Sequence, residues 1–313
     1  MSYKTEIFFR GAQIPQEEAE TLRELENLTR NKFGLVKKVD AGTQMRFSTH
    51  LGHVAALGLW QSKLPRLPKN IGNLKFLNYL QLANTGLDSL PNSICKLLNL
   101  NELLLNDNNF TSFPKIITKL PSLNKLYLSY NDINNIPNSI LELKSLTEFH
   151  LDGNNFSELP KILTSLSTLK YLNFYKNKIK NVPNSVKNLI NLTGLDLGAN
   201  KLTRFPRSIC KLSNLESLFL NYNEIPSIPE CFGKLKKLRF ADLSENKISS
   251  LPESVGNLTK LIELRLIYNK LTSLPKSIKK LKSLSTLIIK YNPIHLSDSL
   301  REHLEIVNNV KIY

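Results

Sequence analysis

Leucine recurs along most of this chain at a fixed interval of 23 residues. From each of these leucines the sequence reads LxxLxLxxNxLxxLPxxIxxLxx, so apolar and polar positions follow one repeating pattern. Val54 extends the series toward the N-terminus and Val307 toward the C-terminus. A period of this length indicates a repeat protein in which each unit is one small supersecondary element. The leucines at position 1 of the units are Leu77, Leu100, Leu123, Leu146, Leu169, Leu192, Leu215, Leu238, Leu261 and Leu284.

Each unit predicts one short strand followed by one helical turn. In LxxLxL the last two leucines are two residues apart, which places both side chains on the same side of an extended strand. Ten of the 15 prolines occupy position 15, where a missing N–H ends any strand. The segment PxxIxxL then spaces apolar residues by three, as in a single helical or 3-10 turn. One unit cannot bury its apolar side alone, so the units should stack into a solenoid with a parallel sheet.

Asparagine occupies position 9 in nine consecutive units. An amide that points inward there can satisfy backbone groups of the adjoining turns, which would otherwise be buried without partners. The first two units have Ser62 and Thr85 at this position, as expected of units at the end of an array. The asparagines are Asn108, Asn131, Asn154, Asn177, Asn200, Asn223, Asn246, Asn269 and Asn292.

Residues 1–53 do not follow the repeat. They predict a helix over about 15–31, because acids follow its first proline and apolar residues recur every three positions over 19–28. Short apolar stretches at 35–39 and 45–47 predict strands. We interpret the region as an N-terminal cap over the first repeat, in preference to an independent functional domain.

Residues 54–313 form the repeats, and 295–313 form a C-terminal cap. Ser299 and Glu302 fit a capping box that opens a short helix. The residues after it reproduce LxxLxL in register, which predicts a last strand and brings the repeat strands to about 12. These residues are Val307, Val310 and Ile312.

The unit resembles the leucine-rich repeat, and its LPxxI form is similar to the 23-residue class of intracellular proteins that includes the Ras-group-related ones. The resemblance covers residues 54–313. It implies an α/β fold: a curved leucine-rich-repeat solenoid with a concave parallel sheet of about 12 strands, helical or 3-10 turns on the convex side, and a helix-containing N-terminal cap. It also implies a non-enzymatic protein-binding scaffold or adaptor in signalling, with a small GTPase or its regulator as one candidate partner.

Positions 2, 3, 5, 7 and 8 of each unit should face solvent on the strand side; we call them the sheet face. They hold nine of the ten tyrosines and the only tryptophan. Tyrosine favours strands in general, but that preference alone would not gather nearly all of them. Because Tyr and Trp supply large, rigid contact area with a polar group, the sheet face is predicted to bind a protein. The candidate residues are Trp60, Tyr79, Tyr127, Tyr130, His150, Tyr171, Tyr175, Phe219, Tyr222, Tyr268 and Tyr291.

The net charge of +16 raises a competing hypothesis, which is binding to nucleic acid or to an anionic membrane. The sheet face itself carries nine acids and seven bases, so a nucleic acid lying in it would meet no net attraction and is not the expected partner. The excess of lysine lies outside this face. Those lysines are either a solvated surface or a basic flank that binds polyanions; two clusters are Lys234, Lys236 and Lys237, and Lys276, Lys279, Lys280 and Lys282.

Catalytic and cofactor motifs are missing. No GxxxxGK[ST], GxGxxG, HExxH or GxSxG segment occurs, so we expect neither an enzyme nor a bound cofactor or metal. His150 among tyrosines is interpreted as a contact residue rather than a proton-transfer group.

Cysteine usage and hydropathy predict the compartment. The three cysteines are too few and too widely spaced for a disulfide framework or a zinc site, and Cys95 and Cys210 are interpreted as small apolar fillers. No run of about 18 apolar residues and no secretory h-region occurs. We therefore expect a cytoplasmic monomer without a transmembrane segment.

Overall fold

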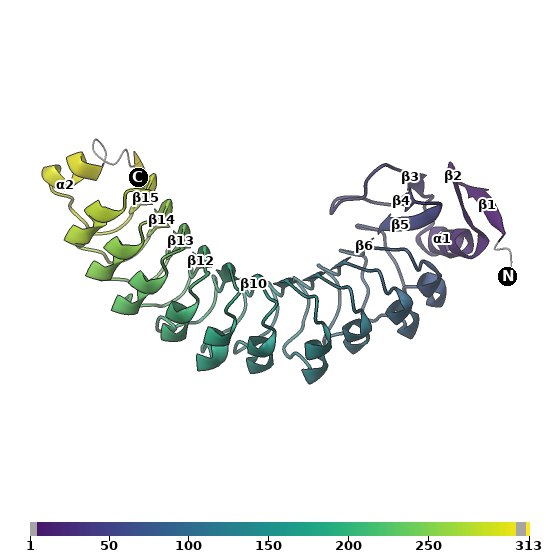
Figure 1. Ribbon diagram of the computed structural model, residues 1–313, viewed down its shortest axis with the longest axis horizontal. Coiled ribbons are helices and arrows are strands. Elements are labelled where there is room, and N and C mark those ends of the chain that lie inside the picture. The colour runs from purple at the N-terminus through teal and green to yellow at the C-terminus, as the bar shows by residue number, and fades with distance from the viewer. Residues whose placement is uncertain (1–4, 305–310) are drawn as a thin grey trace. The chain divides into compact units, whose positions relative to one another are not determined.

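The computed structural model describes residues 5–304 and 311–313. The chain divides into two compact units, residues 1–154 and 155–313. Within each unit, strands lie on one side and short 3-10 helices on the other (Figure 1).

The first unit begins with elements that precede the repeats. These are β1 (Glu6–Phe9), β2 (Ala12–Pro15), α1 (Gln16–Thr29), β3 (Gly34–Leu35) and β4 (Arg46–His50). β1 and β2 form an antiparallel hairpin, and β3 pairs with β4 in parallel. β4 pairs antiparallel with the first repeat strand, so the sheet is not wholly parallel at this end.

The repeats supply one strand each. In the first unit these are β5 (His53–Gly58), β6 (Tyr79–Gln81), β7 (Glu102–Leu104), β8 (Lys125–Tyr127) and β9 (Glu148–His150). In the second they are β10 (Tyr171–Asn173), β11 (Gly194–Asp196), β12 (Ser217–Phe219), β13 (Phe240–Asp242), β14 (Glu263–Arg265), β15 (Thr286–Ile288) and β16 (Lys311–Ile312). The described residues thus contain the twelve repeat strands that the sequence predicts, with β3 and β4 added by the N-terminal region. Val307 and Val310 lie outside the described residues.

A 3-10 helix follows each strand from β5 to β14, and in all ten the proline of position 15 is the N-cap residue. This confirms the turns predicted from PxxIxxL. Their bounds are η1 (Lys69–Asn73), η2 (Asn92–Lys96), η3 (Lys115–Lys119), η4 (Asn138–Glu142), η5 (Lys161–Ser165), η6 (Asn184–Asn188), η7 (Arg207–Lys211), η8 (Glu230–Lys234), η9 (Glu253–Asn257) and η10 (Lys276–Lys280).

A short helix, α2 (Asp298–Glu302), follows β15 in the second unit. Its N-cap residue is Ser297, and that side chain makes no capping hydrogen bond. Ser299 and Glu302 both lie inside the helix, so the capping box predicted for this pair is wrong. Ser297 takes the extended conformation that precedes a helix, two residues before the serine that the motif selected.

Neighbouring repeat strands pair in parallel with an offset of 23 residues. Lys125 is opposite Glu148 in the first unit, and Tyr171 is opposite Gly194 in the second. The same position in successive repeats therefore forms a row across the sheet, with side chains about 4.8 Å apart.

The asparagine of position 9 holds adjoining turns together, as predicted. Asn131 is buried; its Nδ2 donates to the carbonyl oxygens of Leu105 at 3.0 Å and Leu128 at 3.1 Å. Its Oδ1 accepts a hydrogen bond from the N–H of Phe110 at 3.0 Å. One amide thus satisfies backbone groups that water does not reach.

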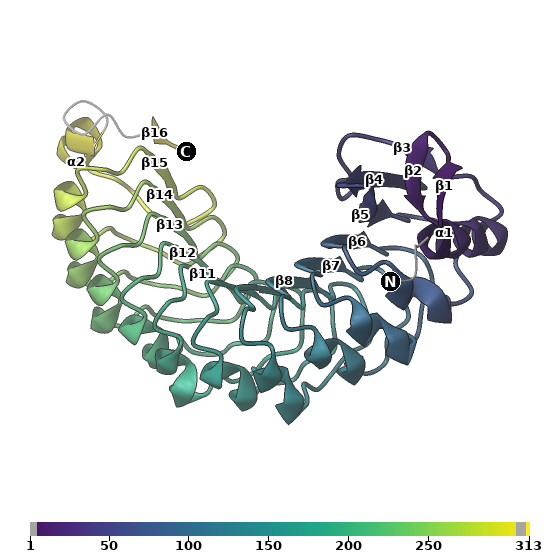
Figure 2. The ribbon, with the colours of Figure 1, turned by 45° about the vertical axis from the view of Figure 1, so that its right-hand side comes forward.

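Helix α1 lies beside β2 and η1 and buries Ala19, Leu22 and Leu25 completely (Figure 2). Glu18, also on the buried side, accepts hydrogen bonds from the N–H of Val54 at 2.8 Å and from His53 Nδ1 at 2.6 Å. The N-terminal region is thus tied to the first repeat strand. Whether it forms a domain separate from the repeats stays a prediction.

Cys210 in η7 and Cys231 in η8 form a disulfide. The interpretation of Cys210 as an apolar filler is therefore wrong. The two residues are 21 positions apart. They occupy position 19 of one repeat and position 17 of the next. The stacking of consecutive 3-10 helices also brings these two positions together elsewhere, for example Gly72 against Ser93 and Gly233 against Ser254. Cys95 occupies position 19 of its own repeat, as Cys210 does, and its thiol is free.

Candidate protein-binding face

The predicted residues of the first unit lie on or just after β5 to β9. Tyr79, Tyr127 and His150 are half-buried on β6, β8 and β9, and Trp60 is half-buried after β5. Tyr130, which follows β8, exposes 43% of its surface. All five therefore offer solvent-accessible ring surface on one side of this unit's sheet.

Tyr127 is held by its neighbours. Its ring stacks on the ring of His150, with centroids 4.4 Å apart and planes inclined by 17°. Its hydroxyl donates to Glu148 Oε2 at 3.4 Å, and Lys125 Nζ forms an ion pair with Glu148 Oε1 at 3.1 Å. Burial and then the carboxylates of Glu102 and Glu148 raise the pKa of the Tyr127 phenol. The group is thus a fixed, protonated donor at neutral pH.

His150 is neutral at pH 7. Burial lowers its pKa below the usual value, and Lys125 lowers it further, while Asp152 and Glu148 oppose the shift. A neutral imidazole adds ring surface to the face without adding charge. The role of His150 as a contact residue stays a prediction.

Two carboxyl groups beside these rings are partly withdrawn from water. Burial raises the pKa of Glu102, Glu148 raises it further, and Lys125 opposes the shift. Burial and the nearby Asp152 raise the pKa of Asp107.

Tyrosine rings in both units lie against a glycine of the next repeat. A Cβ atom built on Gly153 would lie 2.6 Å from Tyr130 Cδ1, and one built on Gly194 would clash with the ring of Tyr171. Tyr175 stands 23 residues before Gly198 and lies over it in the same way. Because glycine has no side chain, each ring can pack against the backbone of the next repeat. This contact holds the ring in place before a partner binds.

The second unit carries the other predicted residues on and after β10 to β15. Tyr171, Tyr175 and Phe219 are half-buried. Tyr268 and Tyr291 stack on each other, with centroids 4.2 Å apart and planes inclined by 9°. Lys290 Nζ lies 4.9 Å from the centroid of the Tyr291 ring, within cation–π range. Together with Tyr222, the set also falls on one sheet side of its own unit.

Residues at position 8 of the repeat have a left-handed backbone conformation. Tyr130, Tyr222, Tyr268 and Tyr291 occupy it with φ of 52°, 55°, 51° and 59°. A bulky residue in this region costs about 1–3 kcal/mol, whereas the glycine of the same position, Gly153, adopts φ of 65° without that cost. The last three of these tyrosines expose 48–54% of their surface, so burial in the core does not explain their placement.

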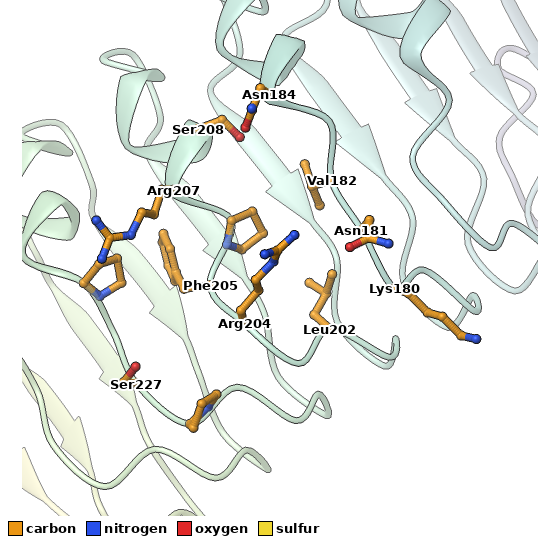
Figure 3. A pocket seen from close by; sticks show the side chains of 13 residues that line it. Lys180, Asn181, Val182, Asn184, Leu202, Arg204, Phe205, Arg207, Ser208 and Ser227 are labelled. Carbon is orange, nitrogen blue, oxygen red and sulfur yellow. The ribbon is translucent and has the colours of Figure 1, made fainter.

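A recess that sequence analysis missed lies in the second unit, away from the sheet face. It holds about 470 Å³ and is centred on Phe205, with three cations and no acid among its lining residues. In Figure 3 the side chains of Arg204 and Arg207 lie on the two sides of Phe205, and Lys180 lies at the margin. A similar recess in the first unit surrounds Phe113. Both recesses surround a phenylalanine at position 14 of a repeat, where the other repeats have Leu, Ile or Val. This difference is the feature of the sequence that could have indicated the recesses.

Metal and membrane sites are not found in the described part of the chain. Among residues 5–304 and 311–313, no group of three His, Cys, Asp or Glu side chains could hold a metal ion. None of the helices described there has the length and apolar character needed to cross a bilayer.

Two family models match the sequence. A leucine-rich repeat region matches residues 20–152, and a leucine rich repeat matches 190–248 and 241–294. Together they cover more than half of the chain. The chain belongs to the leucine-rich-repeat family. A comparison with curated protein sequences found no match.

Solved leucine-rich-repeat structures are similar to this chain. A leucine-rich-repeat protein of Leptospira interrogans is 30% identical over 83% of each chain, with a TM-score of 0.49. An internalin, InlF, of Listeria monocytogenes is 17% identical over 84% of each chain, with a TM-score of 0.67. The ectodomain of the Arabidopsis receptor kinase HAESA, in complex with an N-terminally extended IDA peptide hormone, is 28% identical. That match covers 89% of this chain and 49% of the ectodomain, with a TM-score of 0.71.

Proposed function

We propose that this leucine-rich-repeat protein is a non-enzymatic scaffold or adaptor that binds a protein partner on the sheet face. The observation that supports it most is the set of exposed tyrosines at left-handed residues. Tyr222, Tyr268 and Tyr291 keep about half of their surface in water at positions where glycine fits more easily. A large side chain that stays half in water at a strained backbone position is explained by a contact with another molecule.

The arrangement of the rings supports the same function. The rings packed against glycines and the stacked pair Tyr268–Tyr291 leave little rotamer freedom to lose on binding. Rigid aromatic surface of this kind is what protein interfaces concentrate at their energetic centres. The HAESA ectodomain, a structural neighbour, was solved with a peptide hormone, and this supports a protein or peptide as the ligand class.

The finer parts of the proposal come from the family resemblance and from the sequence. They are a small GTPase or its regulator as partner, a role in signalling, a monomeric state and a cytoplasmic location. The Cys210–Cys231 disulfide provides a test of the location, because disulfides are rare in reducing compartments. Thiol alkylation of cells before lysis would show whether the pair is oxidised where the protein works.

The experiment for the main proposal is affinity capture with matched baits, followed by binding of the purified captured protein. The test variant carries Tyr222→Gly, Tyr268→Gly and Tyr291→Gly, which the left-handed backbone accepts. The matched control carries Arg204→Gln and Arg207→Gln in the same unit, away from the sheet face. We expect a partner that binds the wild type and the control directly and is lost by the tyrosine variant. Equal binding to all three baits would reject the sheet face as the binding surface.

A second candidate function is binding of anions at the recess around Phe205. Its support is the lining by Arg204, Arg207 and Lys180 without an acid. Guanidinium groups bind oxyanions through paired N–H donors. Titration with heparin at several salt concentrations would show weaker binding by the Arg204→Gln and Arg207→Gln variant; unchanged binding would reject this site.

A further inference from the structure

The first unit's sheet face carries a charge opposite to that of the chain as a whole. Among its face positions are the acids Glu102, Asp107, Glu148 and Asp152 and a single base, Lys125, while the chain has a net charge of +16. The face positions of the second unit hold five acids and six bases. The acidic excess of the sheet face is therefore concentrated in residues 1–154.

The one base of this surface is already engaged. Lys125 forms its ion pair with Glu148. No hydrogen bond or ion pair joins the carboxylates of Glu102 and Asp107 to any described residue. Two carboxylates thus stay outside any ion pair: Lys125 lowers the pKa of Glu102 only through its charge, and burial raises the pKa of both groups.

Aromatic rings stand beside each of these carboxylates. Tyr79 on β6 and Lys125 on β8 are the register partners of Glu102, and Tyr127 lies two residues beyond Lys125 on the same strand. Tyr130 lies near Asp107, whose charge contributes to raising the pKa of the Tyr130 phenol. A carboxylate beside an aromatic face is a favourable setting for a guanidinium or ammonium group, which gains an ion pair and a cation–π contact together.

We propose that this part of the sheet face binds a basic segment of the protein partner, with Arg or Lys side chains paired to Glu102 and Asp107. The proposal rests on the proposed function and specifies the chemistry of the partner. Complementarity of charge selects this occupant: an acidic segment or a nucleic acid would be repelled, and a neutral one would leave both carboxylates partly desolvated and unpaired. His150 is neutral at pH 7 and does not compete with the incoming cation.

The first test is direct binding of a defined peptide to the full chain. The probe is a labelled short peptide of alternating arginine and alanine, measured by fluorescence anisotropy beside the same peptide with glutamate in place of arginine. Because the chain itself is strongly basic, non-specific electrostatic repulsion opposes binding of the arginine peptide, so its binding would require a local acidic site. We expect the arginine peptide to bind. Any binding of the glutamate peptide reports basic surfaces elsewhere on the chain and should be the same in the wild type and in the Glu102→Gln with Asp107→Asn variant.

Variants locate the site. Glu102→Gln with Asp107→Asn should weaken binding of the arginine peptide about tenfold, the loss expected for two partly exposed charge pairs. The matched control, Asp88→Asn with Glu142→Gln, removes two acids from other positions of the same unit and should bind like the wild type. Equal binding by the two variants, or no binding of the arginine peptide to the wild type, would overturn the proposal.

Two further outcomes separate this proposal from others. If the arginine peptide fails while the tyrosine variant still loses the captured partner, the scaffold function stands and the basic-segment proposal falls. If the wild type dimerises in sedimentation equilibrium and Glu102→Gln with Asp107→Asn abolishes the dimer, the occupant is the basic surface of a second copy, which also overturns the proposal.

Discussion

Cys210 and Cys231 join consecutive 3-10 helices through a disulfide, with their Cα atoms 5.7 Å apart. The bond closes a loop of nearly one repeat. A disulfide of this span stabilises a protein by about 2–4 kcal/mol, chiefly by restricting the unfolded chain. We expect a reductant to lower the free energy of unfolding of the wild type by this amount in a urea titration. The same reductant should leave a Cys231→Ser variant unchanged, and equal effects on both would contradict the assignment.

The geometry that pairs Cys210 with Cys231 recurs at Cys95. The residue 21 positions after Cys95 is Ile116 in η3, which has the place that Cys231 has in its own unit. We expect Ile116→Cys to form a second disulfide with Cys95 under mild oxidation. Thiol titration of the unfolded, oxidised protein should find one free thiol in the wild type and none in the variant. A variant with two free thiols would show that this stacking does not extend to η2 and η3.

Most of the fold was predictable because each repeat carries it redundantly. Leucines of positions 1, 4 and 6 predict the buried side of each strand, and proline of position 15 predicts where each turn begins. The capping box at Ser299 failed because a single short motif has no such redundancy; Ser297, two residues earlier, precedes the helix equally well.

The site was only partly predictable. The sheet-face tyrosines follow from strand alternation, but their orientation depends on contacts between units. The Tyr171 ring can lie where it does because its register partner, Gly194, has no side chain, a relationship visible only as an offset of 23 residues. The disulfide depends on a different offset, 21, which is set by the stacking of the 3-10 helices rather than by the strands. Neither contact can be predicted from the residues of a single repeat, because both join residues of two successive repeats.

Asn131 gives a test of how much the position 9 amides stabilise the solenoid. Asn131→Ala would orphan the N–H of Phe110, at a cost of about 1–3 kcal/mol, while the carbonyl of Leu105 would keep the hydrogen bond that Asn108 donates. Asn292 makes equivalent bonds but is only half-buried, so water can replace them. In urea titrations we therefore expect Asn131→Ala to lose about 2 kcal/mol and Asn292→Ala less than about 1 kcal/mol. Equal losses would show that the amide's burial does not set its contribution.

Tyr222 separates binding from stability. Glycine removes the strain of the left-handed residue but adds freedom to the unfolded chain, and these effects are of similar size. We expect Tyr222→Gly to change the free energy of unfolding by less than about 1 kcal/mol, because half of the side chain is already in water. A large loss of stability would show that Tyr222 is a packing residue and would weaken the proposed function.

His150 should make the stability of the protein depend on pH. Its pKa in the folded protein is lowered, first by burial, so the unfolded chain binds a proton at higher pH than the folded one does. The stability that neutral His150 contributes is therefore complete above the usual histidine pKa of about 6.5 and is lost as the pH falls from there toward the lowered folded value. Asp152, Glu148 and Lys125 face the imidazole, and Tyr127 stacks on it.

A His150→Phe variant isolates this contribution. Phenylalanine keeps an aromatic ring against Tyr127 but cannot take up a proton. The raised pKa values of Glu102 and Asp107 act with the opposite sign, since protonation relieves their burial, and they are present in both proteins. The difference between the wild-type and variant free energies of unfolding should therefore report His150 alone. We expect the wild type to lose stability relative to the variant as the pH falls below about 6.5; parallel curves would mean that the imidazole is solvated in the folded protein.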